Sequence, residues 1–195
     1  MEKQSTDRRK RKTKKLLRDT LGELMSEKPL KNITITDLTE RADLNRGTFY
    51  LHYRDIFDLL EQNEIEMLQE ISAIFKKIDP SVFTEYYSKN KPYPPLVEIF
   101  DWFKNNLDFG KALLGPHGDI SFLDKMKLTM KDEIYSKHRG INKNSNNAIY
   151  NEYLYDYIIF GFLGIIKQWV HSNAAIPPKE MAVMFVKIAL NGPFK

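Results

Sequence analysis

Hydrophobic side chains recur along this chain at the spacing of an α-helix. Near the N-terminus, Leu17, Leu21 and Leu24 are separated by four and three positions with charged residues between them, so all three share one helical face. From residue 56 the same spacing continues and predicts a helix of about six turns over 55–78. No segment alternates as a strand would, so we expect an all-α fold.

Proline, glycine and asparagine divide the rest of the chain. Pro29 ends the first helix, and residues 79–95 hold four of the nine prolines, which predicts a connection with one short turn of helix. The later apolar segments predict one helix that starts near Leu96 and another over about 120–136. Two further helices are predicted to close the chain after an Asn-rich break. That break is expected at 142–147, and the two closing helices at 150–172 and 179–192.

Two short helices are predicted between the first helix and residue 55. Thr34 or Thr36 starts one of them, and Asn45, a good N-cap residue, starts the other. In the second helix, Phe49 and Tyr53 lie four positions apart and are expected to face the core. Three closely spaced helices with a turn of three or four residues form a helix-turn-helix, whose second helix fits a major groove about 12 Å wide.

Composition narrows the class of protein. The 195 residues include no cysteine, which excludes disulfides, thiolate metal sites and a cysteine nucleophile. The N-terminus has no apolar leader, and the longest uncharged apolar run, 157–166, is about half the length of a membrane span. We therefore expect a cytoplasmic protein without a membrane partner.

Positive charge is concentrated at one end. Residues 1–54 carry 14 Lys and Arg against 8 Asp and Glu, a net +6, and the remaining residues carry 16 against 18. Seven of the eight residues in the run 8–15 are basic. Beside a helix-turn-helix, this run favours a DNA-binding arm, acting by counterion release or in a minor groove, over a solvated surface run.

No pattern of catalysis is present. The four histidines are scattered without metal-ligand spacing, and neither a nucleophile elbow nor a phosphate-binding loop occurs. We expect no enzyme activity, no metal and no cofactor.

The segment ITITDLTERADLNRGTFYLHYRDIFDLL, residues 33–60, closely resembles the signature of the TetR family of transcriptional regulators, and the resemblance extends over 11–60. It implies a DNA-binding helix-turn-helix domain over 1–54 with a basic N-terminal arm. A long helix would join this domain to a helical effector-binding and dimerisation domain over 55–195.

The resemblance also implies a set of DNA contacts. Arg46 and Gly47 occupy positions near base edges, Thr48 and Tyr50 positions where hydroxyls meet phosphates. The family often has a lysine where this chain has Ile56, and Arg54 is the expected substitute. The implied contact residues are Thr34, Thr36, Arg46, Gly47, Thr48, Tyr50, Leu51, His52 and Arg54.

A second stretch, LVEIFDWFKNNLDFGKALLGPHGDISF followed by FGFLGIIKQWV, resembles a C-terminal region of one branch of the same family. It implies a homodimer formed by the last two helices and an effector cavity with aromatic walls, although core packing and relief of crowding remain alternatives. The expected ligand residues are Phe100, Phe103, Phe122, Tyr157 and Phe160. The expected dimer residues are Gly161, Gly164, Trp169, Met181, Met184, Phe185 and Ile188.

The sequence thus predicts a ligand-responsive repressor that binds a palindromic double-stranded DNA operator as a homodimer and responds to a small-molecule effector. The alternative is a co-regulator with the same fold that acts through protein contact rather than DNA.

Overall fold

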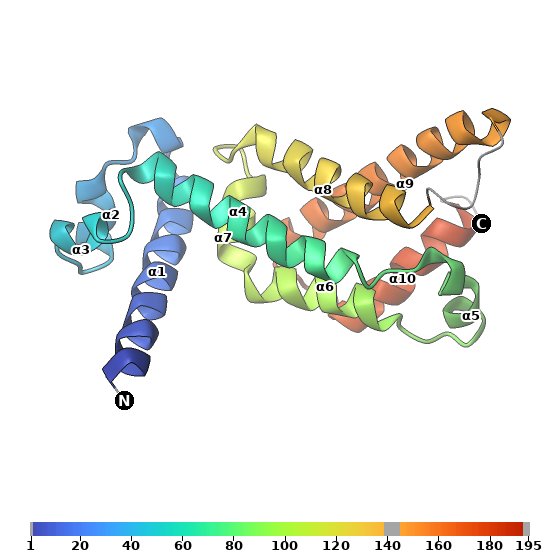
Figure 1. The fold of residues 1–195 in the computed structure, drawn as a ribbon, viewed down its shortest axis with the longest axis horizontal. Helices are drawn as coiled ribbons and strands as arrows, with labels where there is room; N and C mark the ends of the chain where they lie inside the picture. Colours follow the sequence, from blue (N-terminus) through green and yellow to red (C-terminus); the bar gives the residue numbers. More distant parts are fainter. Residues whose placement is uncertain (1, 139–144, 193–195) are drawn as a thin grey trace. The chain divides into compact units, whose positions relative to one another are not determined.

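The structure is a computed structural model that describes residues 2–138 and 145–192. Those residues form ten α-helices and two 3-10 helices and contain no strand, which confirms the predicted all-α fold (Figure 1). The chain packs as two compact units. One unit comprises Met1–Met67 and Asp108–Phe122, and the other comprises Leu68–Leu107 and Leu123–Lys195.

The first unit is built on a long N-terminal helix. Leu17, Leu21 and Leu24 are at most 3% exposed, as their spacing predicted. Figure 1 shows α2 and α3 side by side, and α2 contacts both α1 and α3. The elements are α1 (Glu2–Glu27), η1 (Leu30–Asn32), α2 (Ile35–Arg41), α3 (Arg46–Tyr50), the start of α4 (Ile56–Phe75) and α7 (Leu107–Leu114).

A glycine brings α1 close to α7. A Cβ on the buried Gly22 would lie 3.2 Å from the Cα of Phe109, so a side chain there would push the two helices apart. One turn earlier, the guanidinium of Arg18 lies 5.9 Å from the centroid of the Phe109 ring, within cation–π range. These contacts add α7 to the core of the first unit.

The second unit contains the remainder of α4 and six further helical elements. In this unit α10 packs against α5 and α6, and α6 also contacts α9. The elements are η2 (Pro80–Val82), α5 (Phe83–Ser88), α6 (Pro94–Asn105), α8 (Ile120–His138), α9 (Ser145–His171) and α10 (Pro178–Asn191).

Residues 79–95 are more helical than predicted. The side chain of Asp79 accepts a hydrogen bond from the Ser81 N–H at 2.9 Å and so caps η2, with Pro80 in the first helical position. Pro94 likewise begins α6. A proline in the first turn costs no hydrogen bond, so these prolines start helices instead of interrupting them. The predicted break at 142–147 begins outside the described residues, and 145–147 already belong to α9.

Aromatic rings form the core of the second unit. The ring of Phe162 on α9 lies 5.7 Å from that of Phe75, 5.9 Å from that of Phe100 and 4.8 Å from that of Phe185, measured between centroids. Trp169 packs edge-on against Phe100 at 5.3 Å. Edge-to-face pairs of this kind add stability beyond the burial of their area.

The long α4 contributes its residues up to Met67 to the first unit and the rest to the second. The predicted division after residue 54 separates the chain by role and stays a prediction, whereas the units follow packing. Among the described residues, no helix is both long and apolar enough to cross a bilayer.

Candidate functional site

A four-residue turn, 42–45, separates α2 from α3. Asp43 takes a positive φ of 50° in this turn. At its end the Asn45 Oδ1 accepts a hydrogen bond from the Gly47 N–H at 2.7 Å, which satisfies a donor that the first turn of α3 would otherwise leave unpaired. This geometry is that of a helix-turn-helix.

One face of α3 is anchored in the core. Phe49 is fully buried and Tyr53 is 3% exposed, and their ring centroids lie 5.9 Å apart. Burial raises the pKa of the Tyr53 hydroxyl to about 12. The prediction that both residues belong to the core is confirmed.

The opposite face of α3 is open to solvent. Arg46 and Gly47 at its start are exposed, Tyr50 is 54% exposed and Leu51 is 81% exposed. Thr48 is half-buried. This combination of a cation, a phenol and an apolar side chain on one short helix offers donors for base edges and phosphates together with a methyl contact.

His52 follows α3 and is half-buried. Burial lowers the pKa of its imidazole, and the nearby ammonium groups of Lys14 and Lys10 lower it further. Two lysines of α1 are therefore close enough to the end of α3 to affect its electrostatics. The sequence pattern placed both in a basic run but did not bring them to His52.

The start of α2 distinguishes the two candidate threonines. The Thr34 hydroxyl accepts from the Asp37 N–H at 3.1 Å, and the Thr34 N–H donates to Asp37 Oδ2 at 2.8 Å, forming a capping box. The Lys28 ammonium also donates to Asp37 at 2.8 Å, and these hydrogen bonds hold the pKa of the carboxyl well below its usual range. Both threonines are exposed, but the Thr34 hydroxyl is engaged in the cap, whereas Thr36 lies on the first turn of α2.

The start of α4 explains the departure at Ile56. Ile56 is 4% exposed and belongs to the core, so it offers nothing to a phosphate. The Arg54 side chain is 81% exposed, and its guanidinium donates to Asp58 Oδ1 at 2.9 Å. Asp55 Oδ1 caps the helix by accepting from the Asp58 N–H at 2.8 Å. The Arg54 side-chain and backbone N–H groups hold the pKa of Asp58 at about 2.

The basic run 8–15 lies within α1, so these residues form a helix and not an extended arm. Because α1 is helical here, its cations are divided between two faces.

The second unit contains an apolar cavity of about 470 Å³. Among the described residues that line it, none is charged, and the hydroxyls belong to Ser81 and Tyr155. The other lining side chains come mainly from α4, α6, α9 and α10 and include Phe75, Leu96, Ile159, Phe162 and Phe185.

The five residues predicted to bind ligand do not line this cavity. Phe100, Phe103 and Phe122 are at most 1% exposed, whereas Tyr157 and Phe160 are 62% and 54% exposed on the outside of α9. The ammonium of Lys127 lies 4.3 Å from the Phe160 ring centroid.

The residues predicted to form a dimer also divide by exposure. Gly161 and Gly164 are exposed, and a Cβ on either would meet nothing within 4 Å. Met184 and Ile188 are half-buried. Trp169, Met181 and Phe185 are at most 6% exposed and belong to the core of the second unit.

The described residues contain no cluster of three or more His, Cys, Asp or Glu side chains that could hold a metal ion. The candidate functional features of the described residues are therefore the outward-facing short helix α3, the basic helix α1 and the apolar cavity.

Comparison with known proteins gives the family. A TetR family model, described as "Transcriptional regulator C-terminal region", matches residues 90–191, just over half of the chain. No curated protein matches the sequence.

Solved structures share the fold. A TetR transcriptional regulator from Streptococcus agalactiae is 22% identical with a TM-score of 0.58, over 95% of this chain and 98% of that chain. FadR from Bacillus subtilis, solved with stearoyl-CoA, is 12% identical with a TM-score of 0.56, over 91% and 97%. The dihydroxyacetone kinase operon activator DhaS is 13% identical with a TM-score of 0.56, over 91% and 94%. The match to the family model, together with this shared architecture, shows that the chain belongs to the TetR family of transcriptional regulators.

Proposed function

We propose that this protein binds a palindromic DNA operator as a homodimer, through α3, and represses transcription until an effector releases it. The observation that carries the proposal is the exposed face of α3. Leu51 is 81% exposed and Tyr50 54% exposed on a helix that is anchored by a fully buried Phe49. The Tyr50 ring packs edge-on against Phe49 at 5.6 Å between centroids, and the exposed surface that Tyr50 and Leu51 leave suits a major groove.

The experiment is a gel shift with the DNA upstream of the protein's own gene. Wild type is expected to bind, and Arg46→Ala is expected to weaken binding by about 1–3 kcal/mol, the usual value of a specific base contact. Tyr50→Ala is expected to weaken binding through the loss of a phosphate contact. Lys179→Ala removes an exposed charge in the second unit and serves as the control. Equal binding by wild type and both α3 variants would contradict the contact assignment.

The alternative remains a co-regulator that acts by protein contact. A partner protein does not require a basic α1 next to α3, so the positive charge around His52 favours DNA. The direction of regulation is proposed from the family resemblance, and DhaS, which has the same fold, is an operon activator. A reporter driven by the upstream DNA, with and without this protein, distinguishes repression from activation.

We propose the exposed face of α9 as the dimer contact. Tyr153, Tyr157, Phe160, Gly161 and Gly164 recur at helical spacing and are all exposed. The two glycines would let a second helix approach closely. A dimer supplies two copies of α3, as a palindromic operator requires.

We propose that the effector occupies the apolar cavity of the second unit. Its volume of about 470 Å³ is in the range of small-molecule sites, and FadR of the same fold was solved with an acyl ligand. Because no charged side chain lines the described cavity, 1-decanol is expected to raise the melting temperature more than decanoate does. Ala189→Trp, which fills the cavity, is expected to abolish the shift, and Ala73→Trp at an exposed site is the control.

Regulation requires that the effector change DNA affinity. An effector that prefers the conformation unable to bind DNA lowers operator affinity by its preference between the two states. A ligand that binds tightly in the cavity and leaves operator affinity unchanged would contradict this mechanism.

A further inference from the structure

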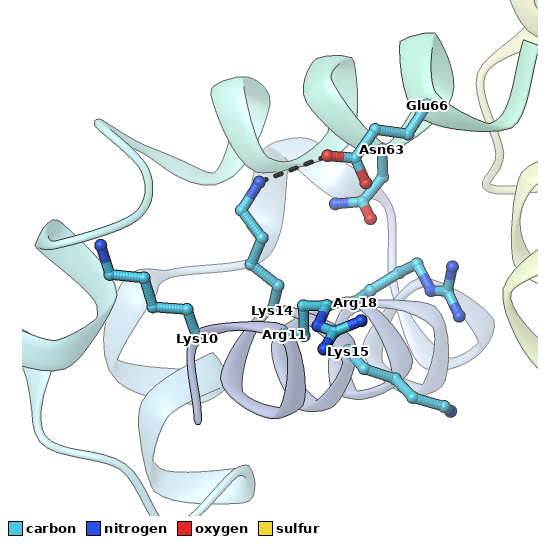
Figure 2. A pocket seen from close by; sticks show the side chains of 7 residues that line it. All are labelled: Lys10, Arg11, Lys14, Lys15, Arg18, Asn63 and Glu66. Atoms are coloured by element: carbon cyan, nitrogen blue, oxygen red, sulfur yellow. Dashed lines mark hydrogen bonds and ion pairs between the residues drawn. The ribbon is translucent and has the colours of Figure 1, made fainter. Parts of the chain in front are cut away.

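A basic groove lies between α1 and α4 in the first unit (Figure 2). Its volume is about 550 Å³. Figure 2 shows the cationic side chains along α1 and the polar side chains on α4, with Lys14 reaching across to Glu66. The lining residues are Lys10, Arg11, Lys14, Lys15, Arg18, Asn63 and Glu66.

The spacing of the cations selects one face of α1. They lie at positions 10, 11, 14, 15 and 18, over just more than two turns and about 12 Å along the helix axis. Arg9 and Lys12 fall on the opposite face of the same helix. Glu66 is the carboxylate among the lining residues, and Asp19 beside them pairs with Lys15 and Arg18, so the five cations still leave the groove with a net positive charge.

Contacts connect this groove to α3. The Lys14 ammonium lies 5.7 Å from the centroid of the Tyr53 ring and 3.3 Å from Glu66 Oε1, so it bridges the end of the helix-turn-helix and α4. Lys10 and Lys14 also lower the pKa of the His52 imidazole. The positive surface therefore continues from the outer end of α3 into the groove.

We propose that the groove between α1 and α4 binds the phosphate backbone of the DNA that flanks each operator half-site. This inference rests on the proposed function, because it requires that α3 bind DNA. A row of cations that continues from the recognition helix matches a polyanion that extends past its contact with α3. A compact anion would instead require cations that converge on one point. The contacts are to phosphates, so they add affinity without sequence preference.

The test measures affinity as a function of salt on two duplexes. One is the shortest fragment of the upstream DNA that wild type still binds, and the other extends it by about ten base pairs, one helical turn, on each side. Wild type is expected to bind the longer duplex more tightly. For wild type, the plot of log affinity against log salt should be steeper on the longer duplex than on the shorter one, by about 0.9 for each additional phosphate that is neutralised.

Variants test whether the groove residues make these additional phosphate contacts. Arg11→Ala and Lys14→Ala are expected to lose the advantage of the longer duplex, measured as the ratio of each variant's own affinities for the two duplexes. Glu66→Gln, which removes the carboxylate paired with Lys14, is expected to bind the longer duplex more tightly than wild type. Arg9→Ala and Lys12→Ala remove the same charge from the opposite face and are expected to keep the advantage.

The outcomes distinguish a failure of this inference from a failure of the proposed function. If wild type binds neither duplex, the proposed function fails. If it binds both equally, or if variants on the two faces of α1 behave alike, only the inference is overturned. A third outcome is that tripolyphosphate raises the melting temperature of wild type but not of Arg11→Ala or Lys14→Ala, while both duplexes bind equally. This outcome would assign the groove to a small polyphosphate and would also overturn the inference.

Discussion

Gly47 is the residue at which stability and recognition can be separated. A Cβ at this position would lie 3.2 Å from Asn45 Oδ1, which belongs to a side chain that can move slightly. Alanine is favoured over glycine within a helix by about 1 kcal/mol, which offsets that contact. The structure thus gives no strong reason for a glycine here unless another molecule approaches α3 closely.

Gly47→Ala is therefore expected to change the free energy of unfolding by less than about 1 kcal/mol and to lower DNA affinity about tenfold or more. Urea unfolding and a binding titration on the upstream DNA measure the two quantities. Unchanged DNA affinity in a folded variant would show that the start of α3 does not approach the duplex.

Asp58 gives the first unit a pH dependence. Its pKa of about 2, set by Arg54, lies below the value of about 3.9 for an unperturbed aspartate. The ionised carboxyl therefore stabilises the folded state above pH 4, and this contribution is lost as the pH falls from about 4 towards 2.

Asp58→Asn is expected to be less stable than wild type at neutral pH, with a difference in urea midpoint that shrinks below about pH 4. Asp124→Asn, at an exposed site on α8, is the control. A difference that stayed constant down to pH 2 would mean that the Arg54–Asp58 pair is not the cause.

Individual residues show where sequence reasoning succeeds. Phe49 and Tyr53 could be assigned to the core because a spacing of four defines a face. Tyr157 and Phe160 were predicted to line a cavity but lie on the surface of α9. A helix that is apolar on more than one side gives no periodicity from which the inner face can be chosen, and α9 is such a helix.

At the scale of elements, the cap of α3 controls how this helix is presented. Asn45 Oδ1 satisfies the Gly47 N–H, and removal of an N-cap side chain costs about 1 kcal/mol. Aspartate caps as well as asparagine does, but it carries a negative charge that would face the DNA phosphates.

Asn45→Asp is expected to retain the unfolding free energy of wild type and to bind DNA more weakly, whereas Asn45→Ala is expected to lose about 1 kcal/mol of stability. Chemical unfolding and DNA titration of the two variants provide the comparison. If Asn45→Asp bound DNA as tightly as wild type, the start of α3 would have to face away from the duplex.

Helix boundaries and the cavity are two features that the sequence pattern did not predict correctly. Prolines at 80 and 94 were read as breaks, but each occupies a first-turn position of a helix. The cavity was harder to predict, because its lining comes from elements as distant in the chain as α4 and α10. Periodicity assigns a residue to a face and does not say which faces enclose a space.

At the scale of the whole molecule, two copies of α3 must act together. The exposed face of α9 is the proposed contact, and Tyr157 and Gly161 lie one turn apart at its centre. Charges on this face would repel each other across a symmetric interface and disturb little within one subunit, because both positions are open.

Tyr157→Glu combined with Gly161→Glu is expected to convert a dimer to a monomer in sedimentation velocity and to leave helical content unchanged in circular dichroism. DNA affinity should fall in parallel, because a single helix-turn-helix contacts one half-site. A wild-type protein that sediments as a monomer, or a double variant that remains a dimer, would rule out this interface.

DNA recognition by α3 is tested most directly by selection of duplexes from a random-sequence library with the purified protein, and with Arg46→Ala and Tyr50→Ala in parallel. Wild type is expected to enrich one palindromic sequence, with half-site centres one helical turn (about 34–36 Å) or a multiple of it apart. Arg46→Ala is expected to lose or relax this preference, whereas Tyr50→Ala, which removes a phosphate contact, is expected to enrich the same sequence with lower affinity. Enrichment of no sequence by wild type, or of the same sequence by wild type and Arg46→Ala, would contradict DNA recognition by α3.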